Sequence, residues 1–166
     1  MILLGVDPGS LKTGWGVLDW RGAKVGSLGY GTLIARGDDP MPERLRTLHD
    51  GLTAVLRTHR PEAMAVESLF YAKNVKSALV LSQARGVLLL ASAQAAVPVF
   101  EYAPLDIKRA LVGYGRAEKK QVQFMVRRLL GLDEEPAPDA ADALAVAFCH
   151  GTRSGREKLL ATKSPG

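Results

Sequence analysis

Four acidic residues in this chain have the types and the spacing to hold divalent metal ions. Asp7 and Glu67 each end a short apolar run. Asp139 and Asp142 stand three residues apart, which places both on one face if that segment is helical. Mg²⁺ is a hard cation that takes carboxylate and water oxygens, and a pair of such ions suits in-line displacement at phosphorus. The four acids therefore predict a site for two Mg²⁺ ions, with Mn²⁺ as a substitute, and chemistry on a phosphate ester.

Each acid also has a purely structural explanation, and these alternatives stay open on the sequence alone. Asp7 precedes Pro-Gly, a common turn, and Glu67 at a strand end can be a surface residue. Asp139 can cap the first turn of a helix. Asp142 is harder to explain in this way, because it lies within an otherwise apolar helical segment. An unpaired charge there costs several kcal/mol, so Asp142 needs a partner or a metal ion.

The hydropathy pattern predicts the elements that must bring these acids together. Strands are predicted at 2–7, 13–20, 24–34, 63–67 and 98–102, and helices at 42–60, 74–96, 104–112, 117–130 and 139–150. Short connections make the first three strands an antiparallel meander, and helical crossovers make the later strands parallel. The predicted fold class is therefore α/β, with a five-stranded mixed sheet flanked by helices. Asp7 and Glu67 then emerge at the same sheet edge, where open-sheet enzymes bind their ligands.

Charge is distributed unevenly along the chain, whose formal net charge is +5. Residues 104–131 hold seven Lys and Arg against two acidic residues, whereas residues 132–150 hold five acidic residues and no Lys or Arg. A basic segment followed by an acidic one is typical of an enzyme that binds both metal ions and phosphate. A solvated helix beside an acidic loop is the alternative.

Length and composition indicate the number of domains and the cellular compartment. The 166 residues suit one domain, predicted at 1–152, followed by a flexible basic tail at 153–166. The single cysteine, Cys149, rules out an internal disulfide and fits a reducing compartment. No run of about eighteen apolar residues is present, and the first residues read as a strand rather than a secretion signal. We therefore expect a cytoplasmic protein without a membrane partner.

Six motifs, in order along residues 2–150, resemble those of the RuvC family of crossover junction endodeoxyribonucleases. They are Asp7-Pro8-Gly9-Ser10, Ala65-Val66-Glu67, Phe70-Tyr71-Ala72-Lys73-Asn74, Gln83-Ala84-Arg85-Gly86, Ala117-Glu118-Lys119-Lys120-Gln121-Val122 and Asp139-Ala140-Ala141-Asp142-Ala143-Leu144-Ala145. The resemblance implies a ribonuclease-H-like homodimer that binds four-way Holliday junctions and makes paired symmetric nicks, leaving 5′-phosphate and 3′-hydroxyl ends. It also implies a Mg²⁺ requirement, the RuvA–RuvB branch-migration complex as a partner, and catalytic and metal-binding roles for Asp7, Glu67, Asp139 and Asp142.

The same resemblance, together with residue chemistry, assigns DNA contacts next to the acids. Phe70 matches the family's aromatic residue at the junction, and Tyr71 either stacks on DNA or covers the core. Lys108 and Lys119 match basic residues near the scissile phosphate, where an ammonium group can neutralise developing charge, and Lys119 is counted as catalytic. Further phosphate contacts are predicted for Lys73, Lys76 and Lys120, with Arg116, Arg127 and Arg128 as a general phosphate-binding surface.

Other features leave alternatives open. The predicted helix 74–96 is apolar on more than one face, so it is either buried within one subunit or shared with a second. The histidines, His49, His59 and His150, are read as surface or helix-end residues. Three other functions compete with a junction nuclease: an actin-like ATPase, which needs a second phosphate loop that this sequence lacks; a junction-binding protein without activity; and a nuclease for RNA or RNA–DNA hybrids.

Overall fold

The computed structural model describes residues 1–68, 74–113, 115 and 117–161, with residues 156–161 as backbone only. Along the chain the elements are β1 (Ile2–Asp7), β2 (Lys12–Arg21), β3 (Lys24–Ile34), α1 (Met41–His59), β4 (Ala63–Glu67), α2 (Val75–Gln94), β5 (Val99–Tyr102), α3 (Pro104–Val112), α4 (Lys119–Leu130) and α5 (Pro138–Ala161). The predicted series of strands and helices is confirmed in order and type, because each element follows the apolar periodicity of its segment.

The five strands form one mixed sheet in the order β3-β2-β1-β4-β5. β1, β2 and β3 pair antiparallel, whereas β4 runs parallel to β1 and β5 runs parallel to β4. Helices separate β3 from β4 and β4 from β5, as the longer crossovers of parallel strands require. The mixed five-stranded α/β sheet predicted from the sequence is therefore confirmed.

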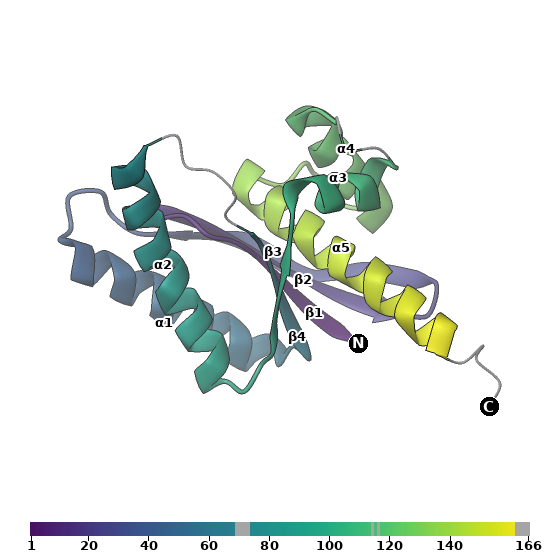
Figure 1. Cartoon of the computed structure of the whole chain (residues 1–166), viewed down its shortest axis with the longest axis horizontal. Helices are drawn as coiled ribbons and strands as arrows, with labels where there is room; N and C mark the ends of the chain where they lie inside the picture. The colour runs from purple at the N-terminus through teal and green to yellow at the C-terminus, as the bar shows by residue number, and fades with distance from the viewer. Residues whose placement is uncertain (69–73, 114, 116, 162–166) are drawn as a thin grey trace.

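Helices cover both faces of the sheet, so the molecule has three layers (Figure 1). α1 and α2 pack on one face, into which Leu4, Val6 and Met64 point from β1 and β4. α3, α4 and α5 cover the other face, where they meet alternate strand residues such as Leu3 and Ala65. The central strands thus bury side chains on both faces, which explains why they read as continuous apolar runs in the sequence.

Local signals fix where the helices begin and end. The Asn74 side chain caps α2 by accepting a hydrogen bond from the Lys76 amide at 2.9 Å. α3 and α4 end at Gly113 and Gly131, whose φ values of 81° and 61° are left-handed and need glycine. These ends keep α3 and α4 short, and both helices pack against α5.

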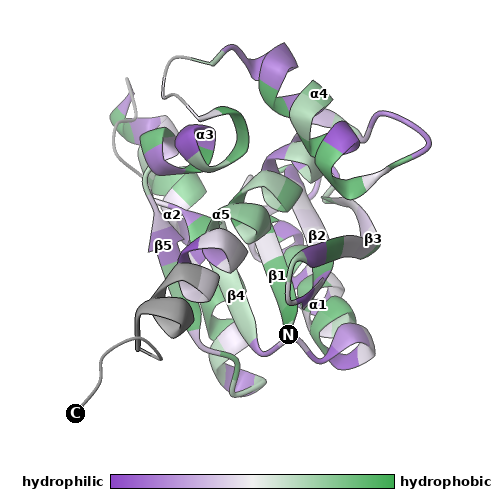
Figure 2. Ribbon diagram, turned by 90° about the vertical axis from the view of Figure 1, so that its right-hand side faces the viewer, coloured by the Kyte–Doolittle hydropathy of each residue, from purple (hydrophilic) through white to green (hydrophobic). Residues whose placement is uncertain are grey.

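α5 is longer than the sequence indicates. The sequence predicts an end near His150 and a flexible tail from residue 153, but the helix continues to Ala161. The predicted helix end was wrong because Gly151, which resembles a helix stop, lies against the ring of Trp20, and this packing overrides local propensity. Figure 2 shows α5 lying across the sheet. Residues 162–166 lie outside the described residues, and the division into a nuclease domain and a tail stays a prediction.

α2 differs from the other helices in its long and largely apolar sequence. By length and composition alone, it is the one helix among the described residues that could span a membrane. A single such helix is weak support for a span, since a helix that covers a core or a second subunit has a similar composition. The predicted absence of a membrane partner therefore stays a prediction.

Candidate active site

Asp7 and Glu67 end the neighbouring parallel strands β1 and β4. Val6 pairs with Val66, so the next residue of each strand leaves the sheet at the same edge. The two acids are far apart in the sequence, and parallel pairing across the centre of the sheet brings them together. This is the arrangement that the strand pattern predicts.

α5 reaches the same edge because glycines let it lie directly on the strands. Gly14 pairs with Asp7 across β1 and β2, and a Cβ atom at Gly14 would overlap the carbonyl group of Asp139. Gly5 makes room for the α5 backbone in the same way. A glycine within a strand often marks such a close backbone approach, a signal that the sequence analysis missed. The first turns of α5, with Asp139 and Asp142, therefore lie next to the end of β1.

The four carboxylates act on one another electrostatically. The pKa of Asp7 is raised from 3.8 to about 7, and burial is the largest cause. The negative charges of Asp142, Glu67 and Asp139, in that order, add to this shift of the Asp7 pKa, and the positive charge of Lys119 opposes it. The pKa of Glu67 is raised as well, first by burial and then by Asp142. Such repulsion requires the charges to be close together, so the acids share one site.

A cavity of about 210 Å³ opens beside these acids. Its lining residues are Glu67, Pro104, Ile107, Lys108, Lys119, Val122, Asp142 and Ala145. Lys119 Nζ lies 2.8 Å from Asp142 Oδ2, and this hydrogen bond raises the pKa of Lys119 above its usual value. α3 and α4 thus supply cations to a cavity whose anions come from β4 and α5.

The donor set of the site consists of carboxylate oxygens, which hard cations prefer. Among the described residues, however, no three His, Cys, Asp or Glu side chains already form a compact metal-binding group. Asp142 is paired with Lys119, whose Nζ lies 2.8 Å from its Oδ2. Gathering the carboxylates around a metal ion requires rotation of side chains between staggered rotamers, which is a small change. The backbone already brings the four residues together. The residues therefore fit Mg²⁺.

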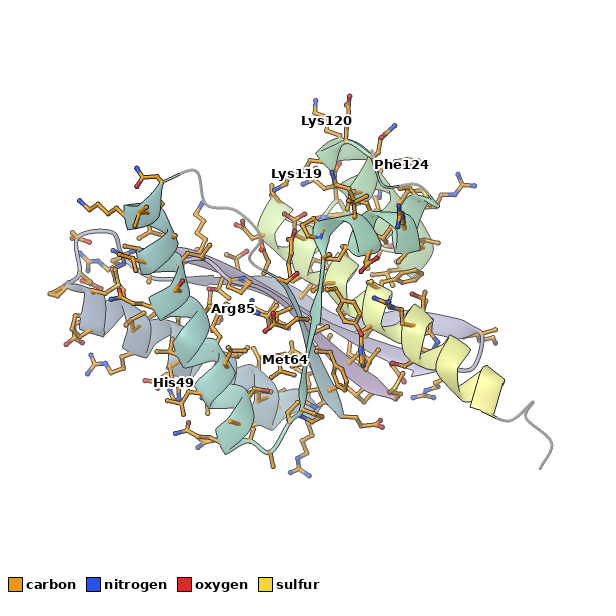
Figure 3. The ribbon with its side chains drawn as sticks, in the orientation of Figure 1. His49, Met64, Arg85, Lys119, Lys120 and Phe124 are labelled. Atoms are coloured by element: carbon orange, nitrogen blue, oxygen red, sulfur yellow. The ribbon has the colours of Figure 1, made fainter. Side chains whose placement is uncertain are left out.

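Arg85 supports this edge of the sheet from α2, and the sequence analysis missed its role. Its side chain is buried, and Nη1 donates a hydrogen bond to the Glu67 carbonyl at 2.8 Å. Nη2 lies 2.8 Å from Glu101 Oε1, an ion pair that lacks hydrogen-bond geometry. Figure 3 shows Arg85 between α2 and the edge of the sheet. Its signal in the sequence was a charged residue in an apolar helix, because a buried charge needs a partner.

The other predicted DNA contacts either do not line the cavity or lie outside the described residues. Phe70, Tyr71, Lys73 and Arg116 lie outside the described residues. Lys76, Lys120 and Arg128 are exposed on α2 and α4. Arg127 donates hydrogen bonds to the carbonyls of Leu132 and Asp133 at 3.3 and 3.0 Å, so its guanidinium holds the loop after α4. The DNA-binding roles of these residues stay predictions.

Histidine and cysteine do not line the cavity. His150 was read as a surface or helix-end residue, but it is buried, with Nδ1 2.6 Å from the Tyr102 hydroxyl. That expectation was wrong because α5 continues past His150 and packs it against β5. Cys149 is buried as expected, and burial raises the pKa of its thiol to about 11. The site therefore depends on carboxylates and lysines, with no sign of a zinc-type ligand set among the described residues.

Comparisons with known proteins match both the sequence and the fold. The family model described as "Crossover junction endodeoxyribonuclease RuvC" matches residues 3–150. The protein of that name from Desulforamulus reducens is 49% identical over 151 residues, which are 90% of this chain and 93% of the relative. The one from Pelotomaculum thermopropionicum is 46% identical over 164 residues, 98% of this chain and 100% of the relative.

Solved structures of RuvC and of another Holliday junction resolvase also match this chain. The structure described as "T. thermophilus RuvC in complex with Holliday junction substrate" has a TM-score of 0.90 and 38% identity, and the match covers 95% of this chain and 96% of the other. The yeast mitochondrial Holliday junction resolvase Ydc2, with a TM-score of 0.61 and 14% identity over 96% of this chain and 85% of the other, shares the fold alone.

Proposed function

Because this chain belongs to the RuvC family of crossover junction endodeoxyribonucleases, we propose that it resolves four-way DNA junctions by means of Mg²⁺ ions held by Asp7, Glu67, Asp139 and Asp142. The fold is ribonuclease-H-like, and the activity is structure-selective cleavage of DNA in recombination and repair. The observation that supports the metal site is the convergence of two strands and one helix on a single group of mutually repelling carboxylates.

In this proposal the carboxylates hold the metal ions, and the lysines of the cavity neutralise charge on the phosphate. Asp7, Glu67, Asp139 and Asp142 would hold two Mg²⁺ ions, which would supply an activated water and stabilise the leaving oxygen. The 5′-phosphate and 3′-hydroxyl ends are those that family membership implies. Lys119 holds Asp142 at 2.8 Å, and a phosphate that enters the cavity brings oxygens to which its ammonium can turn. Lys108 lies on the α3 wall, close enough to lower the pKa of Glu67. Both cations are therefore placed to neutralise charge that develops on the phosphoryl oxygens.

A homodimer through α2 is part of the same proposal. The inner side of α2 packs on α1 and the sheet through Ala84 and Leu88. Its outer side exposes Val75, Leu79 and Leu90 in line with Gly86, beside which a Cβ atom would meet no other atom within 4 Å. A second helix can approach closely at such a position, and this favours the shared-helix alternative. A twofold dimer then presents two equivalent sites to a roughly twofold junction, as paired symmetric nicks require.

Two further features follow from family membership rather than from the described residues. We propose the RuvA–RuvB branch-migration complex as a partner on the junction and the cytoplasm as the location. We also propose that Phe70 contacts the branch point, whereas Tyr71 either stacks on DNA or covers the core.

A nicking assay on a synthetic four-way junction tests the proposal. We expect symmetric nicks with Mg²⁺ or Mn²⁺ and none with EDTA. Asp142→Asn removes one ligand charge, so cleavage should fall at least about a hundredfold while junction binding in EDTA is kept. Asp133→Asn, in the exposed loop after α4, is the matched control and should cleave normally.

The same assay separates the competing functions. An RNA–DNA hybrid and a linear duplex of the same sequence should remain intact under conditions that nick the junction. Near-normal nicking by Asp142→Asn, or nicking in EDTA, would contradict the metal assignment. Preferred cleavage of the hybrid would assign the site to a different nuclease.

A further inference from the structure

A second concave surface lies beside the catalytic cavity, between the last turn of α3 and the outer face of α4. This groove has a volume of about 450 Å³ and is lined by Leu111, Val112, Lys120, Gln121, Phe124 and Met125. Phe124 leaves 57% of its surface exposed. A phenylalanine gains about 1.5–3 kcal/mol when it is fully buried, so an exposed ring in an apolar groove is a candidate contact surface.

On both helices, the residues that line the groove are near neighbours of those that line the catalytic cavity. On α3, Lys108 lines the cavity, and Val112, one turn further on, lines the groove. On α4, Lys119 lines the cavity, and its neighbour Lys120 lines the groove. Four helical residues advance about 6 Å, and stacked nucleotides advance about 3.4 Å each. A DNA strand whose phosphate lies at the two cavity lysines therefore passes over the groove within about two nucleotides.

We propose that this groove binds an unstacked nucleobase of the junction strand, one or two nucleotides from the scissile phosphate. The base stacks on Phe124, its phosphate pairs with Lys120, and the Gln121 amide can hydrogen-bond the base edge. Figure 3 shows Lys120 and Phe124 projecting from α4 away from Lys119, which turns toward the acids. The inference rests on the proposed function, because it places the substrate strand by the catalytic lysines.

The chemistry of the groove favours a base over a protein surface. Among the described residues that line it, Lys120 is the one charged side chain, and its charge is positive. The surrounding segment 104–131 is basic, with seven Lys and Arg against two acidic residues. A volume of about 450 Å³ is in the range of small-molecule sites, whereas a stable protein partner needs about 800 Å² of surface on each side.

Fluorescence of a modified junction tests this inference directly. Four-way junctions would carry 2-aminopurine one or two nucleotides to either side of the scissile bond, and binding would be followed in EDTA. The wild-type protein should quench one of these probes by stacking. Phe124→Ala should remove the quenching and slow single-turnover nicking about tenfold or more, because stacking of one base contributes about 5- to 150-fold.

Two variants serve as controls. Phe124→Trp keeps an aromatic face and should restore both the quenching and the nicking rate. Leu129→Ala truncates an exposed apolar residue of the same helix that does not line the groove, and it should behave as the wild type does.

Several outcomes would overturn the inference. One is unchanged quenching and nicking with Phe124→Ala. Another is a change in the sedimenting mass of Phe124→Ala, which would make the groove a contact between subunits. A third is a defect that arises only when the RuvA–RuvB proteins are present, which would assign the groove to a protein partner. If the wild-type protein fails to nick the junction at all, the proposed function fails instead, and the two failures are thus distinguishable.

Discussion

Asp7 occupies a setting that disfavours its negative charge. It lies at the partly buried end of β1, and three other acids act on it. Its pKa is about 7 in the folded protein, against 3.8 ordinarily, so the folded state holds the Asp7 proton more tightly than the unfolded state does. The contribution of Asp7 to the free energy of unfolding therefore falls as pH rises from about 4 to about 7, and stays low above that.

This linkage predicts that Asp7→Asn stabilises the metal-free protein at alkaline pH. A shift of this size corresponds to at most about 4 kcal/mol, which is several degrees in the melting temperature of a domain this large. Thermal melts in EDTA at pH 8 should show the variant above the wild type, and the difference should shrink toward pH 4. Added Mg²⁺ should raise the melting temperature of the wild type more than that of the variant.

An opposite order of melting temperatures at pH 8 in EDTA would contradict the repulsion inferred among the four acids. Glu134→Gln, at an exposed acid of the loop after α4, is the control and should show no such crossover with pH.

At the scale of elements, the site depends on how closely α5 approaches the sheet. Strand glycines contribute to this contact as well as packed side chains, so part of the helix lies directly on the backbone of β1 and β2. Gly14 is the critical position, because it stands opposite Asp7 and under the Asp139 carbonyl. The distance between Asp7 and the two acids of α5 therefore depends on the absence of a side chain at Gly14.

We expect Gly14→Ala to impair cleavage more than it impairs folding. The added methyl group displaces the first turn of α5, and misplacement of catalytic groups by about 1 Å can cost about a hundredfold in rate. The strain itself should cost about 1–3 kcal/mol of stability. Junction nicking and urea unfolding measure the two effects, and a higher Mg²⁺ concentration should be needed for half-maximal nicking.

Gly26→Ala provides the comparison, because a Cβ atom there meets nothing within 4 Å. That variant should cleave normally and unfold within about 0.5 kcal/mol of the wild type. Equal nicking rates for the two glycine variants would show that the close approach of α5 does not set the geometry of the site.

At the scale of the whole molecule, the helices on the two faces of the sheet have different roles. α3, α4 and α5 build the cavity on one face, whereas α1 and α2 cover the other. Arg85 connects the two sides, since it reaches from α2 to the carbonyl of Glu67. The helix proposed for the dimer is therefore in direct contact with the strand that carries Glu67, one of the proposed metal-binding acids.

Leu79→Glu should convert the dimer to a monomer. Leu79 is 62% exposed on the outer side of α2, and a charge there would be buried unpaired between two copies. Analytical ultracentrifugation should give the mass of one 17.8 kDa chain instead of two. Junction nicks by the variant should lose their pairing.

Leu28→Glu places the same charge at an exposed leucine of β3 and should leave the dimer intact. If Leu79→Glu still sediments as a dimer and makes paired nicks, α2 is not the subunit interface.

Some features of this protein were already determined by its sequence, because they depend on local periodicity and residue chemistry. The alternation of apolar runs and turns predicted the ten elements and the mixed sheet, both of which the structure confirms. The acid set was visible as well, since Asp142 stands in an apolar helix where a charge has no ordinary place. The motifs from Asp7 to Ala145 carried the family resemblance, which the comparisons confirm.

The tertiary structure alone decided what depends on contacts between distant segments. α5 extends past Gly151 because the ring of Trp20, far away in the sequence, packs against it. Arg85 finds its partners on β4 and β5, and the groove at Phe124 exists only where α3 and α4 stand side by side. Local propensity is worth tenths of a kcal/mol per residue, whereas packing and buried charge are worth several, so long-range contacts decide such features.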